Sequence, residues 1–478
     1  MSSLTILFGK TVRYLHSNGI LPTIRKVLRR LQGKNWISAE EDKLYIQSPC
    51  CIASNELWEM PEDCIPFESK VSVIIPTFNG AHELPALIEA LQSQASINDL
   101  EIIIVDSGST DGTTELVTTY GVKLIQISQA QFSHSYSRML GASAATGEYL
   151  LFMTQDALPD RKDWIIRMLQ PCLISGAAAV SCYETPKSDA DLLSHITVWN
   201  WKNVMSGGAD KLTALPDDTS YDSLRRSAQL SDNACLVKRD IYMKLGGHRG
   251  AYAEDLDLGI RLLKSGYKLG ILSSICVVHS HNRPAVYNFK RAIVDGINIA
   301  RIFDDFTLDH IGVSQAISRV FTAACTNRLF VRVLSQHNVP EQSPKEFAEW
   351  TRNEYNRIII ELKSTNKQKI ETLLLTEGDD IDFSVRSFIV PLWQEYSMDY
   401  KFDGVLAATQ ARYIMHTVCP YLETIGKCID KNMRDEICHI IWQYFGQSAG
   451  YTIAAAYLNP SVSDSRIKET VRIYSTGV

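Results

Sequence analysis

Several features that mark whole classes of protein are missing from this sequence of 478 residues. It has no run of about 18 consecutive apolar residues, so no membrane-spanning helix is expected. The start of the chain lacks the basic, apolar and small-residue pattern of a secretory leader, so export is not expected. The formal net charge is -6, which argues against a protein built to neutralise a nucleic-acid backbone, so no nucleic-acid partner is expected.

Closely spaced cysteines are also missing. The 11 cysteines are scattered along the chain, none of them forms a C-x-x-C pair, and their number is odd. Zinc sites and disulfide frameworks both need regular cysteine spacing. The pattern therefore predicts reduced thiols in a cytoplasmic protein.

Acidic side chains are absent from the first 34 residues, because the first acid of the chain is Glu40. Basic and apolar residues recur there at helical spacing, and Gly19 and Pro22 divide the stretch into two short helices. Two interpretations stay open. A basic amphipathic helix binds at a membrane interface, which would place the protein at the inner face of the plasma membrane. The same pattern is also typical of a helical arm that packs on the main domain.

From Val71 onward, short apolar runs alternate with helical patterns. The predicted strands are 71–76, 100–106, 122–127 and 148–153, and the predicted helices between them are 86–94, 115–120 and 135–145. This alternation predicts an α/β domain with a mostly parallel sheet that is covered on both faces. After about residue 305 the patterns become helical. The predicted organisation is a helical arm and linker (1–69), an α/β domain (70–304) and a helical C-terminal region (305–478).

Polar side chains follow the predicted strands at their carboxyl ends, where ligands bind in sheets of this kind. Asp106 ends the second strand, and Asp156 follows the fourth. A diphosphate held by Mg²⁺ or Mn²⁺ needs only one or two carboxylates from the protein, because phosphates and waters complete the shell. Asp156 is suited to that role, although it is equally suited to capping the turn before Pro159.

Two further groups have the chemistry of a site. Glu254 and Asp255 begin an amphipathic helix, where the helix dipole favours carboxylates and where one of them could serve as a general base. His279 and His281 lie at the end of the following predicted strand. These histidines are either structural or ligands of a metal ion.

Six motifs occur in the order found in glycosyltransferase family 2, which has the GT-A fold, and the sequence resembles that family over residues 71–282. They are VSVIIPTFNG, IIIVDSGSTDGT, GEYLLFMTQDALP, SDNACLVKRDIYMKLGGH, AEDLDLGIRLLKSGYKL and VVHSH. Within the family, VDSGSTDGT, FSHSYSR, TQDA and HSH resemble the bacterial rhamnosyltransferase-like enzymes. The resemblance implies a nucleotide-sugar-binding GT-A domain.

The resemblance also implies a role for each matching residue. Asp255 would be the catalytic base with Glu254 beside it, and Asp232 and Asn233 would border the acceptor or donor sugar. The nucleotide sugar would be bound by Pro76, Thr77, Phe78, Glu83, Asp106, Ser107, His134, Arg138 and Gln155. The metal ion, Mg²⁺ or Mn²⁺, would be held by Asp156 and by His279 or His281. Three positions depart from the pattern: Ser107 replaces a second Asp, Asp156 is the only acid of its motif, and Met139 replaces an Asn.

The function implied is inverting, metal-dependent transfer of a sugar onto a glycan or lipid-linked glycan in bacterial envelope polysaccharide synthesis. The rhamnosyltransferase-like motifs favour L-rhamnose from dTDP-rhamnose. A UDP-hexose or UDP-N-acetylhexosamine donor is the alternative, and an inactive nucleotide-sugar-binding scaffold is another. A nucleotidyltransferase is disfavoured, because no glycine-rich signature with an activating lysine follows the first strand.

Overall fold

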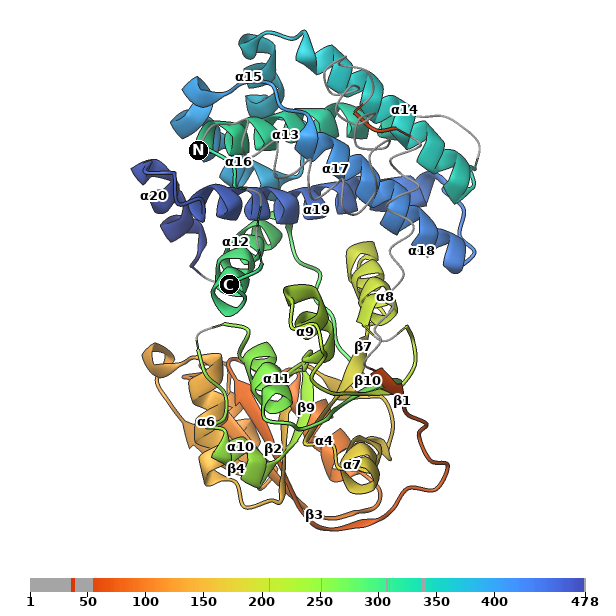
Figure 1. Cartoon of the computed structure of the whole chain (residues 1–478), viewed down its shortest axis with the longest axis vertical. Coiled ribbons are helices and arrows are strands. Elements are labelled where there is room, and N and C mark those ends of the chain that lie inside the picture. The colour runs from red at the N-terminus through yellow and green to blue at the C-terminus, as the bar shows by residue number, and fades with distance from the viewer. Residues whose placement is uncertain are drawn as a thin grey trace. The chain divides into compact units, whose positions relative to one another are not determined.

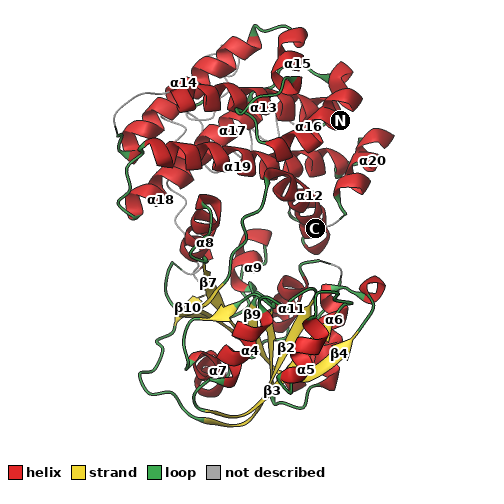
Figure 2. Cartoon of the chain, turned by 180° about the vertical axis from the view of Figure 1, so that it is seen from behind, coloured by secondary structure: helices red, strands yellow, loops and turns green. Residues whose placement is uncertain are grey.

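The structure is a computed structural model that describes residues 36–38, 55–205, 207–250, 252–306, 308, 310–336 and 341–476. Contacts divide these residues into two compact units. The sheet unit comprises 55–283 and 294–308, and the helical unit comprises 36–38, 284–293 and 310–476. Every strand of the described residues lies in the sheet unit (Figures 1 and 2). The predicted basic helices of residues 1–34 lie outside the described residues.

The sheet unit contains a single mixed sheet. Its strands are β1 (Asn55–Leu57), β2 (Phe67–Thr77), β3 (Ile97–Asp106), β4 (Lys123–Gln126), β5 (Tyr149–Met153), β6 (Leu158–Pro159), β7 (Ala179–Thr185), β8 (Lys211–Thr213), β9 (Ala234–Lys238) and β10 (Leu269–Val278). Their order is β1-β8-β10-β7-β9-β5-β2-β3-β4, and β6 pairs with β10. The predicted mostly parallel central sheet is confirmed, because β4, β3, β2 and β5 are parallel neighbours and β7 is parallel to β10.

Strand β9 is antiparallel to both of its neighbours, β5 and β7. Met153 at the carboxyl end of β5 pairs with Ala234 at the amino end of β9. The residues that precede β9 therefore reach the same edge of the sheet as the residues that follow β5. This reversal brings Asp232 and Asn233 toward the site, although they come before a strand rather than after one.

Helices cover both faces of the sheet, as predicted. The helices of this unit are α4 (Leu84–Gln92), α5 (Thr113–Thr119), α6 (His134–Ala144), α7 (Trp164–Ser175), α8 (Leu192–Met205), α9 (Tyr221–Ser227), α10 (Arg239–Lys244) and α11 (Glu254–Lys264), with the 3-10 helix η1 (Gln129–Gln131). Val73 and Ile75 pack with residues of α4 and α7, whereas Ile74 packs with residues of α6 and α11. Alternate side chains of one strand enter two cores, which explains the continuous apolar run.

Strand β1 lies within the stretch that the sequence predicts to be a linker. Asn55 pairs with Thr213 of β8, and Leu57 pairs with Lys211. The partner strand is distant in sequence and only three residues long, so no local pattern reveals the pair. Strand β2 begins at Phe67, two residues before the predicted domain boundary at residue 69. The boundary itself stays a prediction.

Helix α11 carries the two candidate catalytic acids and lies very close to the end of α9. A Cβ atom added at Gly259 would be 1.9 Å from the backbone oxygen of Ala228. Only glycine permits this approach without a shift of the backbone. The glycine therefore sets the position of the helix that begins with Glu254 and Asp255.

The helical unit confirms the predicted helical C-terminal region. Helix α12 (Ala285–Ile302) contributes residues to both units. The remaining helices are α13 (Val313–Gln336), α14 (Pro344–Lys363), α15 (Lys367–Leu375), α16 (Phe383–Tyr396), α17 (Val405–Tyr413), α18 (Cys419–Thr424), α19 (Lys431–Tyr457) and α20 (Ser465–Tyr474), with the 3-10 helix η2 (Ser397–Asp399) and the π-helix η3 (Ile414–Val418). Among the helices of the described residues, none has the length and apolar content needed to cross a membrane. Each cysteine in the described part of the chain is a free thiol.

Candidate active site

Hydrogen bonds join the loops that follow β2 and β3 at the carboxyl edge of the sheet. The backbone N–H of Asn79 donates to Ser109 Oγ at 2.7 Å, and Asn79 Oδ1 accepts from the N–H of Thr110 at 2.9 Å. Asn79 has a φ of 49°, a left-handed conformation that asparagine adopts more readily than most residues. These contacts fix the loop that begins with Phe78, directly after Thr77 at the end of β2.

A second pair of hydrogen bonds joins the loop after β2 to the loop after β5. Phe78 N–H donates to Gln155 Oε1 at 2.9 Å, and Gln155 Nε2 donates to the Phe78 carbonyl at 3.2 Å. The Phe78 side chain stays 42% exposed, so its ring is open to a ligand. Pro76 and Thr77 are the last residues of β2, and the half-buried Glu83 directly precedes α4. The structure thus gathers these five predicted nucleotide-binding residues around one edge.

Asp106 is buried, with 1% of its surface exposed, and it is largely occupied by its own turn. Its carboxylate accepts hydrogen bonds from the N–H groups of Gly108 and Ser109, both at 3.1 Å, and from the Ser109 hydroxyl. Ser107 donates its hydroxyl proton to the Thr77 carbonyl at 2.9 Å. A carboxylate has about four lone-pair positions, so little capacity of Asp106 remains for a nucleotide. Its predicted contact with the base stays a prediction.

His134 is the first residue of α6, and its side chain is exposed. The preceding Ser133 caps the helix by accepting a hydrogen bond from the N–H of Tyr136 at 3.1 Å. The ring of Phe132 lies 5.2 Å from the imidazole, centre to centre. The N-terminus of a helix attracts anions, so the placement of His134 agrees with the predicted nucleotide contact without testing it.

Asp156, His279 and His281 form a cluster in which the candidate ligand atoms all lie within 4.8 Å of one another. Asp156 Oδ1 is 3.5 Å from His279 Nε2, and Asp156 Oδ2 is 3.4 Å from His281 Nε2. Burial lowers the pKa of His281 to about 4, against the opposing charge of Asp156, so its ring is neutral at pH 7. Neutral imidazole is the form that binds metal ions, so His281 is suited to be a ligand. Together the three side chains offer one carboxylate and two imidazoles, a donor set that fits a divalent cation.

Glu184 at the end of β7 orients one of these histidines. Glu184 Oε2 is 2.8 Å from His279 Nδ1, and Glu184 Oε1 accepts a hydrogen bond from Asn233 Nδ2 at 2.7 Å. Burial favours the neutral ring of His279, but the hydrogen bond and charge of Glu184 outweigh it and raise its pKa. With Nδ1 held by Glu184, Nε2 faces Asp156. A carboxylate behind a ligating histidine is the usual arrangement in metal sites.

The candidate catalytic acids begin α11. The residue before them, Ala253, has a φ of 53°, and such left-handed backbone is uncommon for a residue other than glycine. Burial, together with the charges of Asp232 and Glu254, raises the pKa of Asp255 to about 7. A carboxyl group that titrates near neutral pH is well matched to accepting a proton in a reaction at that pH.

Arg138 does not reach open space in the structure, although the sequence predicts a contact with the nucleotide or its diphosphate. It is 3% exposed and lies between two carboxylates. Arg138 Nε is 3.1 Å from Asp232 Oδ2, and Arg138 Nη1 is 2.8 Å from Glu254 Oε1. Both acids are themselves buried. The guanidinium of Arg138 is thus paired with these two acids inside the protein.

The sequence predicts that Asp232 and Asn233 border a sugar. In the structure, these two neighbouring residues contact Arg138 on one side and the Glu184–His279 pair on the other. Burial alone would raise the pKa of Asp232, but the charges of Arg138 and His248 outweigh it and lower the pKa to about 2. Asp232 Oδ2 is 3.0 Å from His248 Nε2, so this carboxylate is shared between two cations when His248 is protonated. Asn233, the next residue, contacts Glu184 and lies 3.3 Å from His279 Nδ1. Both side chains therefore join the charged network, and their predicted contact with a sugar stays a prediction.

Sequence reasoning missed Glu184, Lys187 and His248. Glu184 lies at the end of β7 and Lys187 follows that strand, which was not predicted although the apolar run AAAVSCY carries a strand signal. His248 is 3% exposed and its Nδ1 lies 2.8 Å from the Tyr242 hydroxyl. A lone histidine within GGH gives no local sign of this contact.

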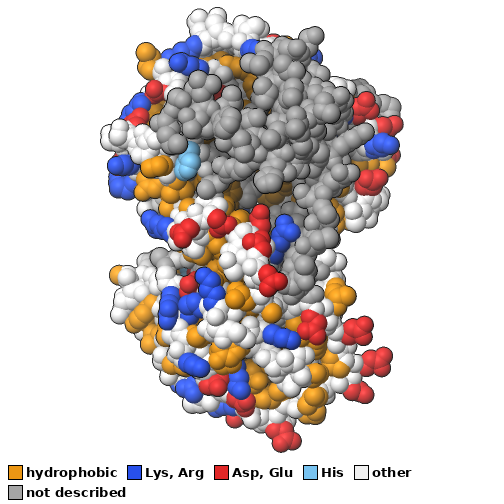
Figure 3. Space-filling view, viewed as in Figure 1, with side chains coloured by type: hydrophobic (Ala, Val, Ile, Leu, Met, Phe, Trp, Pro, Cys, Tyr) orange, Lys and Arg blue, Asp and Glu red, His pale blue; other side chains and the backbone are white. Residues whose placement is uncertain are grey.

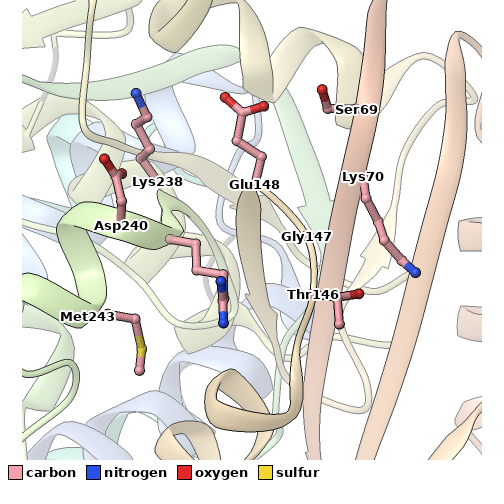
Figure 4. Close-up of a pocket in the computed structure, with 9 residues that line it drawn as sticks. Ser69, Lys70, Thr146, Gly147, Glu148, Lys238, Asp240 and Met243 are labelled. Atoms are coloured by element: carbon pink, nitrogen blue, oxygen red, sulfur yellow. The ribbon is translucent and has the colours of Figure 1, made fainter.

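A cavity of about 800 Å³ lies at the opposite end of the central strands (Figure 4). Lys70 in β2, Glu148 before β5, and Lys238 at the end of β9 are among its lining residues. Tyr149 pairs with both Val71 and Lys238, which places the cavity at the amino end of β2 and β5. None of the candidate site residues lines it.

Comparisons with known proteins identify the family of this chain. Residues 72–226 match the family model of glycosyl transferase family 2. An uncharacterized glycosyltransferase of Haemophilus influenzae is 31% identical over 256 residues, which cover 49% of this chain and 80% of that protein. The chain belongs to glycosyltransferase family 2.

This glycosyltransferase is also similar to two enzymes of O-antigen synthesis. The O-antigen chain rhamnosyltransferase WbaN of Salmonella anatum is 29% identical over 231 residues, which cover 47% of this chain and 71% of that protein. The O-antigen chain rhamnosyltransferase RfbN of Salmonella typhimurium is 27% identical over 235 residues, which cover 48% of this chain and 72% of that protein.

A solved structure of a mannosyltransferase from Pyrobaculum calidifontis, in complex with GDP-Man and Mn²⁺, is 16% identical. The match covers 88% of this chain and 92% of that one, with a TM-score of 0.43. At that score the assignment to the family rests on the sequence matches.

Proposed function

We propose that this glycosyltransferase transfers L-rhamnose from dTDP-rhamnose to a glycan or lipid-linked glycan, with inversion at the anomeric carbon and with a bound divalent cation. The similarity to two O-antigen rhamnosyltransferases supports the choice of sugar. The lipid-linked acceptor would place the enzyme at the inner face of the plasma membrane during synthesis of an envelope polysaccharide.

The observation that carries the proposal is the cluster of Asp156, His279 and His281 at the edge of the sheet. Asn233 lies 3.3 Å from His279 Nδ1, and the preceding residue, Asp232, is joined to Glu254 of α11 through Arg138. Asp156, His279 and His281 would hold Mn²⁺ or Mg²⁺, because a carboxylate and two imidazoles leave positions open for phosphate oxygens. When bound, the cation supplies Lewis-acid stabilisation of the departing nucleoside diphosphate.

The side chains of the protein would divide the remaining work. Asp255 Oδ accepts the proton of the acceptor hydroxyl as that oxygen attacks the anomeric carbon. Arg138 forms ion pairs with Glu254 and Asp232 and so holds both carboxylates in place beside it. Phe78, with its exposed ring, and His134, at the start of α6, orient the nucleotide. General-base assistance is worth about 10²–10⁴-fold in rate.

A donor screen tests the proposal. The purified protein is incubated with MnCl₂ or MgCl₂ and with dTDP-rhamnose, UDP-glucose, UDP-galactose or UDP-N-acetylglucosamine, and the melting temperature and the slow hydrolysis of the donor are measured. We expect metal-dependent stabilisation by dTDP-rhamnose that is lost in Asp156→Ala. Stabilisation by a UDP-sugar alone would contradict the rhamnosyl assignment and favour the UDP alternative. No response to any donor would contradict both.

A further inference from the structure

Lys187 lies beside the proposed metal site and has no part in the function described so far. It follows β7, and its Nζ is 3.6 Å from Asp156 Oδ2. The same carboxylate oxygen is 3.4 Å from His281 Nε2. The side chain of Lys187 is 35% exposed, whereas that of Asp156 is 13% exposed. The Lys187 side chain is thus the more exposed member of this ion pair.

The backbone around Lys187 is attached to the strand end that carries the histidines. The N–H of Lys187 donates to Ser280 Oγ at 3.0 Å. Further along the loop, the N–H of Asp191 donates to Asn282 Oδ1 at 2.8 Å, and Asn282 Nδ2 donates to the carbonyl of Asp189 at 2.8 Å. The Cα atom of Lys187 is therefore fixed relative to the proposed ligands, while its flexible four-carbon side chain can still change direction.

Charge decides what the ammonium group does when the site fills. A divalent cation on Asp156 would repel the ammonium from its present partner, because like charges at such distances disfavour each other. The donor brings a diphosphate of several negative charges to the same place. Arg138, the predicted phosphate-binding cation, is buried between two carboxylates and is not available. On the uncovered part of the sheet unit in Figure 3, basic side chains lie mainly on the left and acidic side chains mainly along the right edge.

We propose that Lys187 binds the diphosphate of the nucleotide-sugar donor, and that without the donor it neutralises Asp156 in competition with the metal ion. The inference rests on the proposed metal site. It assigns two states to one ammonium group: an ion pair with Asp156 before the site is loaded, and a phosphate contact afterwards. A change of Lys187 should therefore affect metal binding and nucleotide binding in opposite directions.

The test compares Lys187→Met with the unmodified full chain, because methionine keeps much of the apolar side chain and removes the charge. Without nucleotide, Mn²⁺ binding is measured by the loss of the free Mn²⁺ electron paramagnetic resonance signal. We expect the variant to bind Mn²⁺ about two- to fivefold more tightly, since an exposed ion pair no longer competes. With saturating Mn²⁺, the binding of dTDP and of UDP is measured by calorimetry. For whichever nucleotide the unmodified chain binds, we expect Lys187→Met to bind it at least about tenfold more weakly.

Two matched variants control the experiment. Lys187→Arg keeps the charge and should retain most of the nucleotide affinity. Lys268→Met removes another ion-paired lysine and should change neither binding constant. Lys268 directly precedes β10, and its Nζ is 3.2 Å from Glu56 Oε2. Circular dichroism and melting temperature confirm that each variant is folded.

The outcomes separate this inference from the proposed function. If the unmodified chain binds Mn²⁺ and nucleotide and Lys187→Met binds both equally well, the role of Lys187 is wrong while the metal site stands. Tighter Mn²⁺ binding with unchanged nucleotide binding would also overturn the phosphate contact. If the unmodified chain and Asp156→Ala bind Mn²⁺ alike, the proposed metal site is wrong, and the inference that depends on it is overturned as well.

Discussion

Arg138 Nη1 lies 2.8 Å from Glu254 Oε1, and both side chains are buried although 116 residues separate them in the sequence. The contact ties the helix after β4 to the helix that carries the candidate base. Its second partner is Asp232, which precedes β9. One guanidinium therefore neutralises two of the three acids around the proposed reaction centre and leaves Asp255 as the acid with a pKa near neutrality.

Removing the Arg138 charge should destabilise the sheet unit severely. Arg138→Met leaves Asp232 and Glu254 as buried carboxylates without their shared cation, and breaking a buried ion pair in this way costs about 3–5 kcal/mol. Urea unfolding followed by circular dichroism gives the free energy. The matched control is Arg161→Met, which removes a more exposed pair with Asp163 and should cost about 1 kcal/mol or less. Equal losses in the two variants would contradict the role of Arg138.

The activity should rise with pH through about 7. Only the ionised carboxylate of Asp255 accepts a proton, and burial together with the charges of Asp232 and Glu254 raises its pKa to about 7. A plot of log kcat/KM against pH should therefore climb with a slope of one below that value and flatten above it. A profile that stays flat from pH 5.5 to 8.5 would show that another group limits the reaction.

Asp255→Asn provides the companion variant for the pH profile. It should lower kcat by about 10²–10⁴-fold and leave nucleoside diphosphate binding nearly unchanged, since the amide fills the same space but cannot accept the proton. Its residual activity should lose the rising limb near pH 7. A variant with normal turnover would rule out Asp255 as the base.

Glu184→Gln should weaken metal binding without removing a ligand. Glu184 holds Nδ1 of His279 at 2.8 Å, and loss of such a partner typically reduces metal affinity by about 10–100-fold. Titration with Mn²⁺ measures the effect directly. Glu101→Gln is a suitable control, because Glu101 also accepts side-chain hydrogen bonds, from Ser72 and Thr146. Glu101 lies in the middle of β3, away from the carboxyl edge of the sheet where the proposed metal ligands lie. An unchanged Mn²⁺ affinity in Glu184→Gln would contradict the role of Glu184 in orienting a metal ligand.

The basic stretch of residues 1–34 predicts binding to anionic membranes. Each basic residue near an anionic surface contributes about 1 kcal/mol, and the attraction falls with ionic strength. The full chain should co-sediment with vesicles of phosphatidylglycerol and phosphatidylethanolamine, whereas a form lacking residues 1–34 should stay in the supernatant. Vesicles of phosphatidylcholine alone serve as the uncharged control. Equal retention of both forms on the anionic vesicles would instead favour a helical arm packed on the protein.

Much of the sheet unit follows from local sequence. The strands predicted at 71–76 and 100–106 lie within β2 and β3, and the helix predicted at 135–145 is α6 to within one residue at each end. Apolar runs and helical periods are local properties, and parallel strands place their carboxyl ends together. For that reason Asp156, His279 and His281 could be identified as candidates before their contacts were known.

The antiparallel strand β9 could not be read from sequence in the same way. The run ACLVK is short and apolar, and such a run gives no direction. Its direction depends on pairing with β5 and β7, and this pairing sets the place of Asp232 and Asn233. The segment Asn55–Leu57 is a strand for a similar reason, because its partner β8 is distant along the chain.

The sequence by itself determined the family, the alternating strands and helices from residue 71 to residue 153, and the candidate acids and histidines, because each depends on local patterns or ordered motifs. Only the tertiary structure decided that Arg138 neutralises Asp232 and Glu254, that Glu184 orients His279, and that Lys187 lies beside Asp156. These are contacts between side chains distant in sequence, and their energies depend on burial and on distances of a few ångströms. Such quantities exist only once the chain has folded.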